Sequence, residues 1–430
     1  MLRSTSLLRT AASSLGLRVA AAGLGLINGI LLGRLLGPAE LGVYSIALSI
    51  VNFLATVAVL GLPTLATREV ASSVEHARWN HLRTLVRSVH RWTVLAALSV
   101  LGMSAIVLGA GIFEPPVSWG VVLIVMVLVP AVALNLLRAG ILRGLHRVLL
   151  ADIPELVLRP GAMLLMLGGA YVTVVHAGAF HALAMQLVAV GAALAVGTWW
   201  LVIRRPAELK AAVLEVPQRA WLRDALPFLA ITMINALAGQ VSLYLLGYLG
   251  GAGHAGLYHA ANQLVGVITI GLVAVNMPLQ PKLAAAWARG SKTEAQRLVA
   301  ETARIGTAVA FAGMLVLLLF AESLLGLYGA QYVEAGDALR VLAAGQLINA
   351  AAGSCGILLM MTGHQKAVMH GMALALVVNA LTAYLAVPTL GVVGGALAAV
   401  LGIACWNVYL VVYAARKLGV DTTVRSSMRR

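Results

Sequence analysis

The 430-residue sequence contains little charge, few aromatic residues and almost no cysteine. Only 10% of its residues are charged and 6% are aromatic, whereas 61% are hydrophobic and the mean hydropathy is +0.95. Because soluble domains carry roughly 25% charged residues, this composition excludes an ordinary soluble enzyme, and the high apolar content excludes a disordered chain. The two cysteines, Cys355 and Cys405, lie inside apolar stretches and indicate neither a disulfide framework nor a metal site. The remaining class is a membrane protein.

Sequence motifs of enzyme active sites are also missing. The chain has no G-x-x-x-x-G-K-[ST] phosphate loop, no H-E-x-x-H metal motif and no nucleophile elbow. The pairs His76/His81 and His364/His370 lack the spacing and companion ligands of a metal site. We therefore expect no catalytic residue, no metal and no cofactor, and a secondary carrier rather than an enzyme.

Long apolar runs predict twelve transmembrane helices. Helices rather than barrel strands are expected, because unbroken apolar runs of this length satisfy their own backbone hydrogen bonds in lipid. The first run continues to Leu36, which is too long for the apolar core of a secretory signal. The spans lie near Leu15–Leu36, Leu41–Ala66, Trp92–Ile112, Val117–Leu137, Leu156–His176, Phe180–Ile203, Ala225–Tyr248, Gly256–Leu279, Ile305–Leu327, Leu339–Met361, Ala367–Pro388 and Val392–Ala414.

The net charge of +15 comes from 30 Lys and Arg residues against 15 Asp and Glu. On the predicted topology, 26 of the 30 basic residues lie on one side of the membrane, among them Arg138, Arg143 and Arg147 in the connection after the fourth span. The positive-inside rule then places both termini in the cytoplasm. The charge excess therefore indicates topology and contact with lipid headgroups rather than nucleic acid binding.

The sequence repeats itself at an offset of 214 residues. Residues 31–47 and 245–261 are identical at eight of 17 positions, including the G-x-Y turns Gly42–Tyr44 and Gly256–Tyr258. Each half contains six predicted spans, so the halves form a parallel repeat, which is typical of transporters with a substrate site between the halves. The expected organisation is an N-terminal six-helix lobe (1–203), a cytoplasmic linker (204–223) with a short surface helix at Glu208–Glu215, a C-terminal six-helix lobe (224–414) and a basic cytoplasmic tail (415–430).

The first span carries a glycine at every fourth position, namely Gly25, Gly29, Gly33 and Gly37. Small residues at this spacing let helices approach closely, so we interpret them as a packing seam. They are not a dinucleotide-binding loop, because no strand precedes them and no acidic partner follows.

Polar residues within the second, seventh and eighth spans are candidate substrate contacts. Several share one helical face, and His259 and Gln263 fall at the repeat offset from Ser45 and Ser49. Hydrogen bonding between helices explains any single one of them equally well, but their recurrence in both halves favours a cavity lining. The candidates are Ser49, Asn52, Asn235, His259, Asn262 and Gln263.

Basic residues in or beside the spans are a second set of candidates. Arg18 and Arg159 lie near the cytoplasmic ends of spans, and Arg68 has Lys282 as its counterpart in the repeat. Snorkelling explains each residue alone, but together they predict a cationic vestibule suited to a diphosphate. No acidic residue lies at a span centre, which disfavours export of cations.

Several motifs resemble those of bacterial polysaccharide biosynthesis transporters, the O-antigen-type lipid-linked oligosaccharide flippases of the multidrug/oligosaccharidyl-lipid/polysaccharide exporter superfamily. The N-terminal signature is matched by Gly33–Tyr44, Gly61–Pro63 and Arg68–Ala71. Three turns are also similar, at Gly140–Arg147, Gly363–Lys366 and Pro388–Ala396. These motifs indicate the fold better than the substrate.

The resemblance implies a flippase of the bacterial inner (plasma) membrane. Such a protein moves a polyprenyl-diphosphate-linked oligosaccharide from the cytoplasmic to the outer leaflet by alternating access, and Arg18, Arg68, Arg159 and Lys282 are its implied head-group contacts. The coupling ion, H+ or Na+, stays open, and other polysaccharide assembly proteins are potential partners. The alternatives are a multidrug exporter of the same superfamily and, from another class, a membrane glycosyltransferase or polymer ligase.

Overall fold

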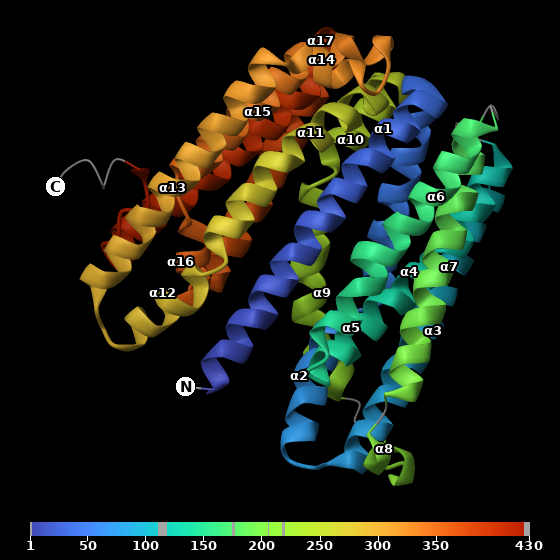
Figure 1. The fold of residues 1–430 in the computed structure, drawn as a ribbon, viewed down its shortest axis with the longest axis vertical. Helices are drawn as coiled ribbons and strands as arrows, with labels where there is room; N and C mark the ends of the chain where they lie inside the picture. Colours follow the sequence, from blue (N-terminus) through green and yellow to red (C-terminus); the bar gives the residue numbers. More distant parts are fainter. Residues whose placement is uncertain (1, 111–117, 174–176, 205, 217–219, 425–430) are drawn as a thin grey trace. The chain divides into compact units, whose positions relative to one another are not determined.

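The computed structural model describes residues 2–110, 118–173, 177–204, 206–216 and 220–424. All regular elements among them are helical, which confirms the all-α prediction (Figure 1). The chain packs as two compact units. Unit 1 contains Met1–Asn28 and Ile46–Ala236, and unit 2 contains Gly29–Ser45 and Leu237–Arg430. The lobe boundaries expected from the sequence stay a prediction, and residues 29–45 pack with the second half of the chain rather than the first.

Unit 1 is built from the first nine α-helices of the chain and one π-helical turn. Their bounds are α1 (Leu2–Ala58, shared with unit 2), α2 (Leu62–Glu75), α3 (Trp79–Gly109), α4 (Trp119–Gly144), α5 (Val148–Ile153), η1 (Pro154–Leu158), α6 (Arg159–Val172), α7 (Ala179–Ile203), α8 (Ala207–Ala211) and α9 (Ala220–Ala238). The short surface helix predicted in the linker is therefore present as α8, although it ends at Ala211.

Unit 2 continues with the remaining helices. They are α10 (Val241–Leu249), α11 (Ala252–Asn276), α12 (Leu279–Ala288), α13 (Lys292–Leu319), α14 (Ala321–Gly326), η2 (Ala330–Ala335), α15 (Gly336–Ala351), α16 (Cys355–Met361) and α17 (Gln365–Leu418). α17 is divided at Gly391, whose backbone is not helical, so its two arms correspond to the eleventh and twelfth predicted spans.

Seven helices within the described residues are long and apolar enough to cross a membrane, or nine if two pairs of shorter helices each form one broken span. α1 and α17 each cover two predicted spans across a glycine kink, and the continuous segment α5–η1–α6 covers most of the fifth. Counted in this way, the helices correspond to the twelve predicted spans. The predicted span ends at Ile112, Val117 and His176 lie outside the described residues.

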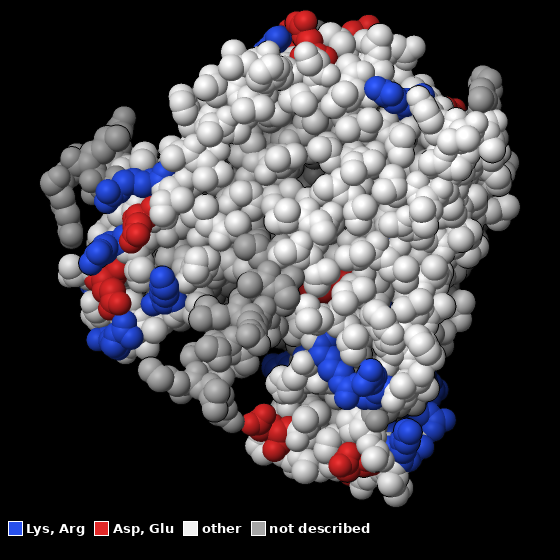
Figure 2. Space-filling view, viewed as in Figure 1, with Lys and Arg blue, Asp and Glu red and all other residues white. Residues whose placement is uncertain are grey.

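The surface separates charged from apolar side chains. On the face shown in Figure 2, Lys, Arg, Asp and Glu gather toward the helix ends, with few between them. Large apolar side chains are exposed elsewhere, such as Leu165 (79% exposed) and Leu385 (72%). Exposed apolar area on this scale is unfavourable in water and is the expected surface toward lipid. The protein is therefore a multi-pass membrane protein.

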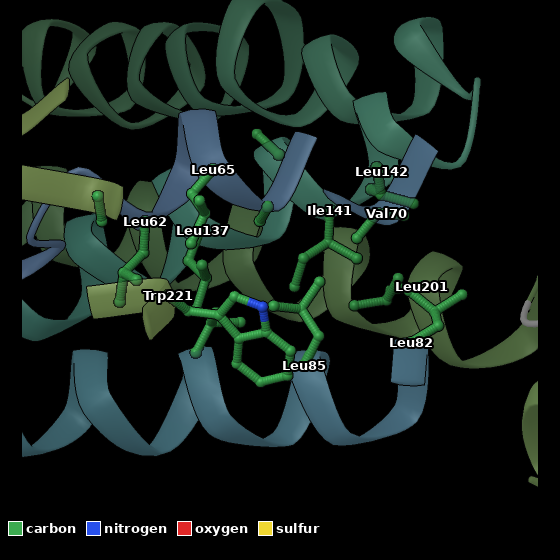
Figure 3. Packing of buried hydrophobic residues seen from close by; sticks show 14 of the residues in the cluster. Leu62, Leu65, Val70, Leu82, Leu85, Leu137, Ile141, Leu142, Leu201 and Trp221 are labelled. Carbon is green, nitrogen blue, oxygen red and sulfur yellow. The ribbon is translucent and has the colours of Figure 1, made fainter. Parts of the chain in front are cut away.

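Each unit also has a compact apolar core that includes a short helix, α2 in unit 1 and α12 in unit 2. In unit 1, Leu62 and Leu65 of α2, Leu85 of α3 and Leu137 of α4 surround Trp221 of α9 (Figure 3). In unit 2 the corresponding cluster includes Leu279 and Leu283 of α12. α2 and α12 lie at nearly equivalent positions of the 214-residue repeat, so both halves anchor this helix in the same way.

The backbone of unit 2 reproduces the repeat in detail. Gly37 has φ 71° and ψ 174°, and Gly251, 214 residues later, has φ 86° and ψ 167°. Only glycine adopts these angles readily. A new helical segment begins directly after each glycine, at Pro38 and at Ala252. The sequence match therefore reflects the same break and restart of the helix in both halves.

The two restarted helices cross at Gly42 and Gly256, which lie within helices and not in the turns expected from the sequence. A Cβ on Gly42 would collide with the carbonyl oxygen of Ala252, and a Cβ on Gly256 would collide with the carbonyl oxygen of Pro38. Residues 38 and 252, like 42 and 256, are one repeat apart, so the contact is reciprocal. Glycine is required at positions 42 and 256 because the backbone of each helix lies directly against the backbone of the other.

The predicted glycine seam is confirmed at Gly29 and Gly33 but not at Gly25, where nothing lies within 4 Å of a Cβ, and Gly37 is the break between two helical segments. A Cβ on Gly29 would overlap the amide of Gln263, and a Cβ on Gly33 would lie 2.8 Å from Cδ1 of Tyr328. The Tyr332 hydroxyl also donates a hydrogen bond to the Gly33 carbonyl, at 3.4 Å. This segment of α1 thus packs closely against α11 and the α14–η2 region.

Candidate substrate-binding site

Unit 2 contains an open cavity of about 320 Å3 between α10, α11, α15 and α17, and its mainly apolar lining includes several polar side chains. Its lining combines three amides, two hydroxyls, one indole ring and small or apolar groups. The lining residues are Ala238, Gly239, Ser242, Tyr258, Asn262, Asn349, Met372, Ala375, Asn379, Ala399, Gly402, Ile403 and Trp406. None of these described residues is charged.

Hydrogen bonds between helices hold the polar side chains in place. The Ser242 hydroxyl donates to Oδ1 of Asn379 over 2.8 Å, and Nδ2 of Asn407 donates to Oδ1 of Asn349 over 3.0 Å. Ser242, Asn379 and Asn407 are buried, so each pair offsets the cost of removing its groups from water. The arrangement fixes the orientation of the amides before any ligand binds.

Gly402 lets the two arms of α17, before and after Gly391, approach closely at this cavity. A Cβ at that position would lie 3.1 Å from the carbonyl oxygen of Ala375 and 3.1 Å from Cβ of Asn379. The close approach brings Asn379 on the first arm and Trp406 on the second to one cavity wall. The kink at Gly391, which reverses α17, is what makes this possible.

A second, smaller cavity of about 80 Å3 shares Asn349 with the first. It also contains Asn276, Thr302 and Ser354, and the Ser354 hydroxyl donates to Oδ1 of Asn276. The two cavities meet at Asn349, and none of their described lining residues is charged. Amide and hydroxyl groups of this kind recognise neutral hydroxyl-rich ligands through paired donors and acceptors.

Of the sequence-predicted residues in unit 2, only Asn262 lines this cavity. Gln263 instead accepts a hydrogen bond from the Tyr328 hydroxyl, at 3.2 Å, beside Gly29. His259 is half-buried on the same helix, and Lys282 is exposed on α12. The substrate-binding roles of these four residues stay predictions.

The polar candidates Ser49, Asn52 and Asn235 belong to unit 1. Ser49 is buried on α1, whereas Asn52 is exposed. The amide of Asn235 donates to the Ile231 carbonyl of its own helix, at 2.8 Å. Their roles as ligand contacts therefore stay predictions as well.

The cationic candidates of unit 1 differ in environment. Arg18 is exposed on α1, and Arg68 is exposed on α2, where it pairs with Glu69 at 3.0 Å. Arg159 is less accessible and forms an ion pair with Glu155, also at 3.0 Å. Arg68 and Lys282 thus occupy equivalent exposed positions on α2 and α12, as the repeat predicted, while Arg159 already has a carboxylate partner.

The sequence interpretation missed the polar residues contributed to the cavity by the last three spans. Asn349 and Asn379 line the cavity, and Asn407, which lies beside Trp406, holds the Asn349 amide. Each asparagine interrupts a long apolar run. Amides inside transmembrane helices are a recognisable signal. The sequence does not show which side chains contact these amides, because their partners lie on distant segments of the chain.

The expected position of Arg138 in a cytoplasmic connection is wrong. Arg138 lies within α4 and is only 1% exposed, and its three guanidinium nitrogens have no hydrogen-bond partner among the described residues. The guanidinium occupies the space beside Gly197 of α7. A buried, unpaired cation within a span is costly and points to a functional role.

Gly197→Ala is expected to destabilise unit 1, because the new methyl group would coincide with Nη1 of Arg138. Overpacking of this kind costs about 1–3 kcal/mol. Thermal unfolding of the purified protein measures the effect, with Gly191→Ala as the control, since nothing lies within 4 Å of a Cβ at that position of the same helix. Equal melting temperatures for the two variants would contradict the prediction.

Comparison with solved structures identifies the fold. The chain is similar to a multidrug resistance MATE family transporter of the MOP superfamily in an inward-facing conformation, with a TM-score of 0.77, 15% identity, and coverage of 92% of this chain and 94% of that chain. It is also similar to a MOP superfamily transporter from Pyrococcus furiosus, with a TM-score of 0.67, 16% identity, and coverage of 96% and 95%. No curated protein matches the sequence significantly. The fold is thus that of the MOP superfamily transporters.

The family is given by the sequence itself. Residues 7–287 match the model of the polysaccharide biosynthesis protein family, and the chain belongs to that family. Family and fold together make it a membrane transporter rather than a membrane glycosyltransferase or polymer ligase, located in the inner membrane of bacteria.

Proposed function

We propose that the protein is a flippase that moves a polyprenyl-diphosphate-linked oligosaccharide from the cytoplasmic to the outer leaflet by alternating access. The observation that carries this proposal is the uncharged cavity of unit 2, whose described lining includes three amides, two hydroxyls and the indole ring of Trp406. Sugar hydroxyls pair with such groups, and the apolar face of a sugar ring packs on an indole ring. Membership of the polysaccharide biosynthesis family supports the same substrate class.

The exposed cations suit the other end of this substrate. Arg18, Arg68 and Lys282 are accessible, and a diphosphate binds such groups through charge-assisted hydrogen bonds. Arg159 is a fourth candidate contact, with one of its guanidinium nitrogens already paired with Glu155. H+ and Na+ are both compatible with this scheme as the coupling ion, and other polysaccharide assembly proteins are its expected partners.

A multidrug exporter is the second candidate, favoured by the similarity to a multidrug resistance MATE family transporter. The described lining of the cavity in unit 2 contains no carboxylate to neutralise an organic cation. The two functions differ in the ligand that the same purified protein transports, so one reconstituted system distinguishes them.

The test is translocation in liposomes that contain the purified protein and a fluorescent polyprenyl-diphosphate oligosaccharide. Arg18→Ala is expected to slow translocation, and a variant that also carries Arg68→Gln and Lys282→Gln should be slowed at least about tenfold, because each lost charged hydrogen bond costs about 1.5–3 kcal/mol. A membrane-impermeant glycosidase measures the lipid that has crossed.

The matched control replaces three exposed cations elsewhere, with Lys366→Gln, Arg416→Gln and Lys417→Gln. Wild-type transport by the control and slow transport by the first variant support the proposed vestibule. Equal rates would refute the role of the three cations, and transport of cationic dyes without any oligosaccharide lipid would refute the flippase itself.

A further inference from the structure

A third cavity, in unit 1, lies under the segment that connects the two halves of the sequence. It has a volume of about 480 Å3 and is formed by α3, α4, the end of α7 and residues 209–214. Its lining is mainly apolar with basic groups, and the described lining residues include no Asp or Glu. They are Leu82, Arg83, Val86, Arg87, His90, Ile141, Leu145, Leu201, Leu209, Lys210 and Leu214.

Hydrogen bonds attach the connecting segment to α3 and so form the cavity. Arg83 donates to the carbonyl groups of Lys210 and Ala212. The backbone N–H of Val213 donates to Oδ1 of Asn80 over 2.7 Å, and the N–H of Glu215 donates to the Thr84 hydroxyl over 2.8 Å. Arg83 is therefore used to hold the segment. The exposed Arg87 and Lys210 are the cations that remain at the cavity.

The surface beside the cavity is apolar and exposed. Val213 is 68% and Val216 87% exposed on the connecting segment, and Trp199 and Ile203 are exposed at the end of α7. Apolar side chains next to basic ones at the end of a transmembrane helix are typical of the membrane interface. The cavity thus opens where phospholipid headgroups and the first carbons of their chains are found.

We propose that this cavity binds an anionic phospholipid, with its phosphate between Arg87 and Lys210 and the beginning of one acyl chain on Val86, Leu145 and Leu214. The arginine offers a fork of donors and the lysine a compact charge. The apolar walls exclude a small soluble anion as the best ligand, because most of the cavity surface would remain unsatisfied by it. The bound lipid holds the connecting segment on α3. This site shares no lining residue with the cavity of unit 2 and does not depend on the transported substrate.

Native mass spectrometry of the full-length protein tests the proposal with phosphatidylglycerol, phosphatidylcholine, undecaprenyl phosphate and inorganic phosphate as separate probes. Phosphatidylglycerol is expected to stay bound to the wild-type protein and to raise its melting temperature, and the other three probes are not. Arg87→Gln with Lys210→Gln should weaken phosphatidylglycerol binding at least about tenfold, since each basic residue at an anionic lipid contributes several-fold. The control Arg416→Gln with Lys417→Gln removes the same charge elsewhere and should bind normally.

A cavity-filling variant separates this site from a merely basic surface. Leu145→Trp leaves the charge unchanged and should also reduce phosphatidylglycerol binding, because it occupies the space for the chain. Equal phosphatidylglycerol binding by the Arg87/Lys210 variant and its control would overturn the proposal, as would wild-type binding by Leu145→Trp. Retention of inorganic phosphate or undecaprenyl phosphate in preference to phosphatidylglycerol would overturn the assignment to a phospholipid.

Discussion

Replacing Trp406 by alanine is expected to reduce oligosaccharide-lipid translocation at least about tenfold, whereas Trp406→Phe, which keeps a ring in the cavity, retains most of it. The loss follows from removing the only indole in the described lining, on which a sugar ring can pack. Asn379→Leu should have an effect of similar size. It removes an amide and leaves the buried Ser242 hydroxyl without its acceptor, at a cost of about 1–3 kcal/mol.

The same liposome assay measures these variants, with melting temperatures recorded for each. Trp119→Ala is the matched control, because Trp119 is 61% exposed at the start of α4 and lines neither cavity used in these tests. Wild-type translocation by well-folded Trp406→Ala and Asn379→Leu proteins would show that sugars do not use this cavity. Normal oligosaccharide transport combined with lost dye transport would instead favour the multidrug candidate.

Gly256→Ala is expected to be strongly destabilising, because its methyl group would collide with the carbonyl oxygen of Pro38 and a backbone cannot give way as a side chain does. The expected loss is about 3 kcal/mol, at the upper end of the usual cost of overpacking. Gly42→Ala should be similarly destabilising, because its methyl group would collide with the carbonyl oxygen of Ala252. The loss of stability in the double variant should be smaller than the sum of the two single losses, because both changes disrupt the same contact.

Thermal unfolding and translocation both report this effect. Gly266→Ala lies on the same helix as Gly256 and Gly25→Ala on the same helix as Gly42, and nothing lies within 4 Å of a Cβ at either control position. These controls should be as stable as the wild type or slightly more so, since alanine favours a helix over glycine by about 1 kcal/mol. If Gly256→Ala melts together with Gly266→Ala, the helices do not cross as the structure has them.

Most of the fold could be predicted because membrane helices follow from composition and length alone. Apolar runs of about 20 residues have to be helical in lipid. The sequence repeat was correctly recognised, but the backbone breaks fall at Gly37 and Gly251, five residues before the predicted G-x-Y turns. Arg138 was misplaced for a related reason. A basic residue at the end of an apolar run looks like a loop residue, and only the missing side chain of Gly197, on another helix, gives it space inside the protein.

The candidate cavity was harder to predict than the helices. Asn262 was selected from its own helix, but its neighbours in the cavity come from α10, α15 and both arms of α17. A single sequence shows which residues share one face of a helix, but it does not show which helix packs against that face. The kink at Gly391 was visible as a turn, whereas the pairing of Asn379 with Ser242 across 137 residues was not.

The reciprocal contact of Gly42 and Gly256 also bears on how such a chain can arise. Each half supplies both the glycine and the carbonyl that the other half needs, so a duplicated and fused gene forms the whole contact at once. A chain of half this length would make the same contact as a symmetric homodimer, with one patch serving both partners. After fusion, a change at either glycine damages a surface of the opposite half, which ties the further evolution of the two copies to each other.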